Sequence, residues 1–93
     1  MSGPTVRLAC LPAPVVALLR AVHDALDVPL PGLTDADERA HAVLLHQRAR
    51  EAWIVLGYVL DDGHEVGPSA ESLRAWTARN PVEYTPWDGG GVA

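Results

Sequence analysis

Residues 34–60 run without a strong helix breaker, and this stretch constrains the fold more than any other feature. Thr34 is a favourable helix N-cap, and acidic residues follow it in the first turn, where the helix dipole favours anions. The next breaker is the Asp61-Asp62-Gly63 turn, and Gly57 is only a weak point before it. We therefore predict one helix of about 26 residues, or roughly 39 Å.

This predicted helix has two apolar faces when residues are placed about 100° apart around its axis. The first face contains Ala36, Ala40, Val43, Leu44, Ile54 and Tyr58. The second contains Ala42, Leu45, Ala49, Ala52, Trp53, Leu56 and Leu60. Two polar seams separate the faces: Arg39, His46 and Glu51 on one side, and Asp37, His41 and Arg48 on the other. Because 53–60 is apolar nearly all round, we expect that end to be deeply covered; a buried strand there is the alternative.

Shorter helices are predicted on either side of the long one. The first runs from about Ala13 to Asp27 and ends before Pro29; the last begins at the N-cap Ser69 and ends near Asn80, before Pro81. Residues 1–11 are expected to form an extended strap and residues 81–93 an extended tail. The sequence thus predicts a single all-α domain, 1–93, of three helices with a long central helix.

The two apolar faces of the central helix require neighbours on both sides. We expect the two shorter helices to lie one on each side of it. The alternative is that a second copy covers one face, which would form a homodimeric helical bundle. A chain of 93 residues has a thin core, and this favours the dimer slightly.

Composition excludes several classes of function. The formal net charge of −5 argues against a nucleic-acid backbone or an anionic membrane as the main partner. No apolar run approaches the roughly 20 residues of a membrane-spanning helix, and the first residues lack the features of a signal peptide. Cys10 is the single cysteine, so no internal disulfide forms, and we expect it to be a small buried hydrophobe. These features predict a cytoplasmic protein.

Motifs for catalysis or cofactor binding are absent. The sequence contains no phosphate-binding glycine loop, no Cys-x-x-Cys pair and no serine in a nucleophile-elbow setting. We therefore predict no catalytic residues, no cofactor and no enzymatic activity. Glu38 and His41 form Glu-x-x-His, the spacing found in di-metal helical bundles. Such sites need a second motif and two further glutamates, so a metal-binding bundle is kept only as an alternative.

DNA binding is a second alternative, because three helices can hold a helix-turn-helix. The recognition helix would be 69–80, which carries Arg74 and Arg79. Two arginines are few against the overall acidity of the chain. The loop 61–68 is also acidic and longer than the usual turn of 3–4 residues. The leading expectation therefore includes no nucleic-acid partner.

The aromatic residues are the most informative candidates for binding. They are Trp53, Tyr58, Trp76, Tyr84 and Trp87. Core packing is the simplest role for each, and for Trp53 above all, whereas Tyr84 and Trp87 lie on the tail. Tryptophan and tyrosine also anchor protein interfaces. We therefore predict a small non-catalytic interaction or accessory module that binds a protein partner or a second copy through these five side chains.

Two segments resemble a known group of proteins. They are 21–31, AVHDALDVPLP, and 80–87, NPVEYTPW. Both resemble small helical proteins of high-GC actinobacteria, a group without assigned activity. The lack of Lys and Phe agrees with a high-GC source. The resemblance implies a helical fold and no catalytic residue.

Overall fold

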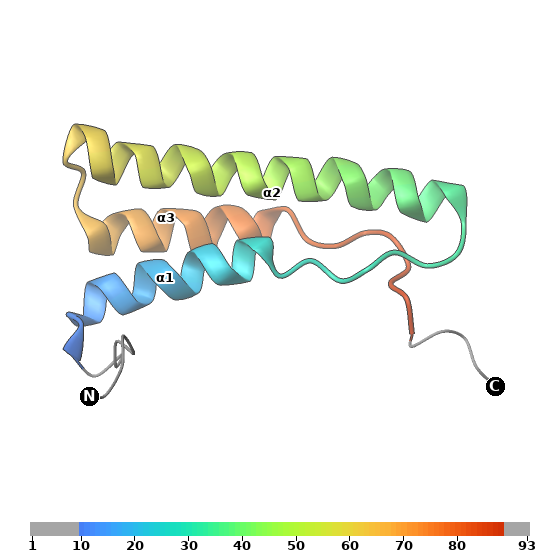
Figure 1. The fold of residues 1–93 in the computed structure, drawn as a ribbon, viewed down its shortest axis with the longest axis horizontal. Coiled ribbons are helices and arrows are strands. Elements are labelled where there is room, and N and C mark those ends of the chain that lie inside the picture. Colours follow the sequence, from blue (N-terminus) through green and yellow to red (C-terminus); the bar gives the residue numbers. More distant parts are fainter. Residues whose placement is uncertain (1–9, 89–93) are drawn as a thin grey trace, which may run out of the picture.

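Three helices make up the described part of the chain in the computed structural model, which describes residues 10–88. They are α1 (Ala13–Leu26), α2 (Asp35–Asp62) and α3 (Val66–Arg79). Figure 1 shows α1 and α3 side by side and parallel to each other, with the longer α2 antiparallel to both. Within residues 10–88 the only β-type pairing is an isolated bridge between Pro31 and Pro86. The prediction of an all-α domain with a long central helix is confirmed.

The predicted ends of α2 are confirmed, and each has a local cause. At its start the side chain of Thr34 accepts a hydrogen bond from the backbone N–H of Asp37, at 3.0 Å. At its end Gly63 adopts the left-handed conformation, with φ of 69°, and its N–H donates to the carbonyl of Tyr58. Glycine adopts this conformation without a steric penalty, so Gly63 ends the helix.

α3 begins four residues earlier than the sequence predicts. Its first residue is Val66 and its N-cap is Glu65, so Ser69 and Pro68 both lie inside the helix. Proline is tolerated in the first turn because the N–H it lacks has no intrahelical acceptor there. The connection from α2 is therefore only residues 63–65, and the expectation of a long loop to Pro68 is wrong.

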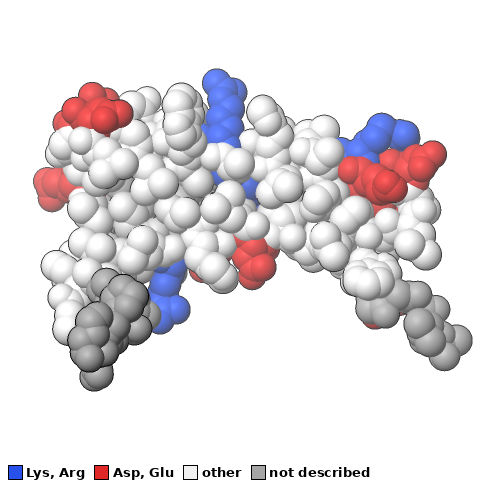
Figure 2. Space-filling model, viewed as in Figure 1, with Lys and Arg blue, Asp and Glu red and all other residues white. Residues whose placement is uncertain are grey.

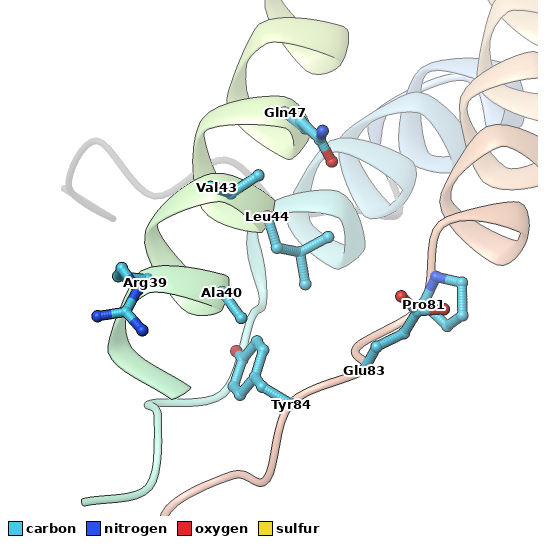
Figure 3. A pocket seen from close by; sticks show the side chains of 8 residues that line it. All are labelled: Arg39, Ala40, Val43, Leu44, Gln47, Pro81, Glu83 and Tyr84. Atoms are coloured by element: carbon cyan, nitrogen blue, oxygen red, sulfur yellow. The ribbon is translucent and has the colours of Figure 1, made fainter. Parts of the chain in front are cut away.

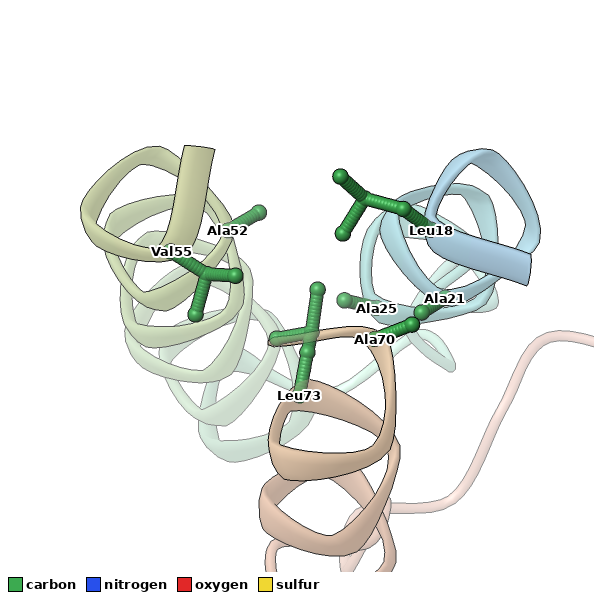
Figure 4. Packing of buried hydrophobic residues seen from close by; sticks show 7 residues of the cluster. All are labelled: Leu18, Ala21, Ala25, Ala52, Val55, Ala70 and Leu73. Atoms are coloured by element: carbon green, nitrogen blue, oxygen red, sulfur yellow. The ribbon is translucent and has the colours of Figure 1, made fainter. Parts of the chain in front are cut away.

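A single core lies where the three helices meet. It consists of Leu18, Ala21, Ala25, Ala52, Val55, Ala70 and Leu73. Leu73 points from α3 into the space between α1 and α2, and the alanines of α1 and α3 face each other (Figure 4). These small side chains let α1 and α3 pack closely together, and both then lie on the same side of α2 (Figure 1). The expectation that they lie on opposite sides of the central helix is wrong.

Extended segments, rather than helices, lie against the N-terminal half of α2. The backbone N–H of Gly32 donates to the carbonyl of Thr85 at 2.8 Å, and that of Trp87 donates to the carbonyl of Leu30 at 2.8 Å. These bonds join the α1–α2 connection to the tail. The predicted extended tail is confirmed up to residue 88. The predicted strap, 1–11, falls mostly on residues 1–9, which lie outside the described residues, as do residues 89–93.

Candidate interaction surface

One of the two polar seams of α2 faces the interior of the protein. Asp37, His41 and Arg48 belong to this seam, and they share a helix face with the buried Leu44 and Val55. Each of the three polar side chains contacts a specific group of a neighbouring segment. The sequence pattern predicts this seam as a polar border between two packed apolar faces. In the structure α1, α3 and the tail pack directly against the seam itself.

Arg48 is the centre of this interior seam, and its side chain is 5% exposed. Its Nε and Nη2 atoms donate to the carbonyl of Asn80, at 3.2 and 2.9 Å, just beyond α3. Its Nη1 atom donates to the carbonyls of Ala25, at 3.1 Å, and Asp24, at 3.4 Å, in the last turn of α1. A buried cation thus binds the negative ends of two parallel helix dipoles. The C-terminal ends of both helices thus lie together against the middle of α2.

Tyr84 lies inside the chain, on the same side of α2. Its hydroxyl donates to the carbonyl of Pro29, and its ring meets the ring of His41 edge-on, with centroids 5.8 Å apart. The adjacent backbone N–H of Thr85 donates to the carboxylate of Asp37 at 3.3 Å. Burial raises the pKa of the Tyr84 phenol, and the positive charge of Arg48 lowers it in part. Tyr84 therefore anchors the tail against α2, and its side chain is buried and not available to a partner.

The second apolar face of α2 is uncovered within the described chain. We call it the outer face and define it by Ala42, Leu45, Ala49, Trp53, Leu56 and Leu60. Trp53 is 73% exposed and Leu60 is 78% exposed, and of the six residues only Leu56 is half-buried against the core. The expectations that Trp53 lies in the core and that 53–60 is deeply covered are therefore wrong. Both fail for one reason: α1 and α3 occupy the same side of α2.

The surface along α2 is largely uncharged between its ends. Figure 2 shows acidic groups gathered at both ends of this helix, with mostly uncharged atoms and some cationic side chains between them. The outer face spans 42–60, or about 27 Å of helix. A continuous apolar strip of this kind on a small protein typically marks a contact with another molecule.

The other aromatic residues are distributed over different surfaces. Tyr58 is exposed and stacks on the ring of His64, with centroids 4.9 Å apart. Trp76 on α3 is half-buried and Trp87 on the tail is exposed. The five aromatic side chains predicted to bind a partner therefore do not form one patch, and only Trp53 lies on the outer face.

Several pockets border α2. A pocket of about 470 Å³ lies between its N-terminal half and the tail, where the Tyr84 ring approaches Ala40 and Leu44 (Figure 3). A second, of about 620 Å³, is lined in part by Glu51, His64 and Ser69. A third, of about 310 Å³, lies beside Trp53. Its other lining residues are Ile54, Gly57, Tyr58, Asp61 and Asp62.

The residues singled out for metal binding have other surroundings. Glu38 is exposed, while His41 packs half-buried against Tyr84. Over residues 10–88, no group of three or more His, Cys, Asp or Glu side chains is placed to hold a metal ion. Cys10 is exposed, which contradicts the expectation that it is a buried hydrophobe. It lies before α1 and so outside the core made by the helices.

The residues singled out for DNA binding lie on the surface. Arg74 and Arg79 are both exposed on α3. However, α2 and α3 lie antiparallel and side by side (Figure 1), whereas the two helices of a helix-turn-helix cross at roughly 90–120°.

No helix within residues 10–88 combines the length and apolar character needed to cross a membrane. The resemblance to small actinobacterial helical proteins stays a prediction. No known protein family, curated protein or solved structure matches this chain.

Proposed function

We propose that this protein is a small, non-catalytic interaction module of the cytoplasm that binds a protein partner through the outer face of α2. One observation carries the proposal: Trp53 and Leu60, two large apolar side chains at i and i+7, are 73% and 78% exposed on the same helix face. Tryptophan is enriched among the residues that dominate binding energy at protein interfaces. The apolar side chains that flank it would exclude water from such a contact.

The rigidity of the outer face supports this role. On the adjoining side, α2 is fixed by the core residues Ala52 and Val55 and by the hydrogen bonds of Arg48. A partner therefore meets a helix that is already formed, and little ordering free energy is lost on binding. The charged groups near the ends of α2 would form the polar rim of the contact.

The test compares two leucines of similar exposure. Leu60 is 78% exposed on the outer face, and Leu33 is 83% exposed in the α1–α2 connection. We expect the full chain, isolated under native conditions, to retain its bound protein in the wild type and in Leu33→Asp but to lose it in Leu60→Asp. Far-ultraviolet circular dichroism should show the same helix content in all three. Equal retention by Leu33→Asp and Leu60→Asp contradicts the proposal.

A further inference from the structure

We infer that the occupant of the outer face is a second copy of this chain, whose α2 packs antiparallel against the first α2 in a two-fold symmetric dimer. This inference rests on the proposed function, because it names the partner for the same surface. α1 and α3 both lie on one side of their own α2 (Figure 1), and of the outer-face residues only Leu56 packs against the core that they form.

The sizes of the outer-face side chains are self-complementary in this orientation. A two-fold axis across α2 at the level of Glu51 places Ala42 opposite Leu60 of the second copy. The same axis places Ala49 opposite Trp53, and brings Leu45 within one residue of the level of Leu56. Ala42 and Ala49 thus each face one of the two most exposed large side chains of the outer face, so that large groups fill the space left by small ones. A parallel arrangement would place Trp53 on Trp53 and Ala49 on Ala49, which leaves gaps between the helices.

Charge at the border of the outer face also favours the antiparallel orientation. Arg39 and Asp61 lie on the same border of the face, near opposite ends of α2. Neither has an ion-pair partner within residues 10–88. In an antiparallel pair, residues on the same border face each other, so Arg39 of each copy approaches Asp61 of the other. These two contacts outweigh the one unfavourable approach, that of Arg50 to Arg50 of the other copy near the axis. A parallel pair would not bring Arg39 near Asp61, because the two residues lie near opposite ends of α2.

The groove beside Trp53 is part of the same contact. Gly57 leaves this side of α2 without a side chain, and a Cβ placed there would meet only the carboxylate of Asp61, at 3.9 Å. In the antiparallel register this groove faces His46 of the second copy. The groove therefore lets two helices approach closely beside a projecting tryptophan, as small residues do at packed helix interfaces.

Sedimentation velocity over a range of concentrations tests the identity of the partner. We expect the wild type and Leu33→Asp to form a dimer, and Leu60→Asp to be monomeric at every concentration. A wild type that is monomeric throughout overturns the inference of a second copy. If that monomer still retains a different protein in the experiment above, and Leu60→Asp loses it, the proposed function stands without the dimer. A dimer that persists in Leu60→Asp also overturns the inference.

Disulfide trapping tests the orientation. In a Cys10→Ser background, which removes the exposed native thiol, chains carrying Ala42→Cys are mixed with chains carrying Leu60→Cys and oxidised. We expect the mixed 42–60 disulfide to form at least about tenfold faster than either self-disulfide, because only that pair meets across an antiparallel contact. Ser72→Cys on the exposed side of α3 is the matched control and should cross-link slowly. Dominant 42–42 and 60–60 products would show a parallel dimer and overturn the inferred orientation.

Discussion

Arg48 shows how one side chain can hold the ends of two helices together. Its guanidinium group supplies donors to three backbone carbonyls, those of Asp24, Ala25 and Asn80. Buried charges are normally paired with an opposite charge, yet these acceptors are helix-end carbonyls, which carry only partial negative charge. The planar guanidinium suits this arrangement, since its donors point in fixed directions toward two different helices.

Replacing Arg48 should therefore destabilise the protein strongly. We expect Arg48→Met to lower the free energy of unfolding by about 2–4 kcal/mol. Methionine has no donor group, so the backbone carbonyls that Arg48 binds would stay buried without a hydrogen bond. Arg48→Lys should retain part of the stability, since one ammonium group can reach fewer of the acceptors. Urea unfolding followed by circular dichroism measures both changes. Arg50→Met, at an exposed position two residues away, should change the value by less than about 0.5 kcal/mol when all variants carry Leu60→Asp, which removes the outer-face contact.

Tyr84 should make stability fall at alkaline pH. Burial, opposed in part by Arg48, raises its pKa above the ordinary value of 10.0. The folded state thus prefers the neutral phenol, so this contribution to stability is complete below the unfolded-state pKa and is lost as the pH rises through the folded-state pKa. Urea unfolding at a series of alkaline pH values should show this loss in the wild type and a smaller one in Tyr84→Phe. An identical decline in both proteins would contradict the assignment.

At the level of helices, the sequence predicts boundaries better than packing. Thr34 and Gly63 bound α2 correctly because caps act locally. The start of α3 was misplaced because Pro68 reads as a breaker but is tolerated in a first turn. The side on which α1 and α3 pack depends on how closely alanines such as Ala25 and Ala70 let two helices approach, which no periodicity within one helix contains. For the same reason the sequence shows that the outer-face residues are apolar but does not show that they are exposed.

The two glycines of the α2 region should respond to alanine in opposite directions. Gly57 lies in mid-helix with space for a Cβ, so Gly57→Ala should stabilise the chain by about 0.5–1 kcal/mol. Gly63 has φ of 69° at the C-cap, so Gly63→Ala should destabilise it by about 1 kcal/mol. Thermal unfolding of both variants in the Leu60→Asp background, where no contact at the outer face contributes, measures these changes. Equal signs would contradict the helix end described here.

The whole molecule consists of two differently built halves that share α2. The C-terminal half of α2 packs on α1 and α3 through the core, including Ala52 and Val55. The N-terminal half packs only on extended segments, held by Tyr84, by Asp37 and by the paired backbones of 30–32 and 85–87. Packing between helices buries more apolar surface than packing against these extended segments. The two halves should therefore differ in local stability.

Native-state hydrogen exchange should reveal this difference as a step along one continuous helix. We expect amides of 39–47 to exchange through openings of lower free energy than amides of 52–59, with the change near Arg48. Truncation after Asn80 removes Tyr84 and the backbone pairing of the tail, so it should accelerate exchange in 39–47 much more than in 52–59. Tyr84→Phe should produce a smaller change in the same direction, because it removes one hydrogen bond and leaves the ring in place. Uniform acceleration along α2 after truncation would show instead that the helix opens as a single cooperative unit.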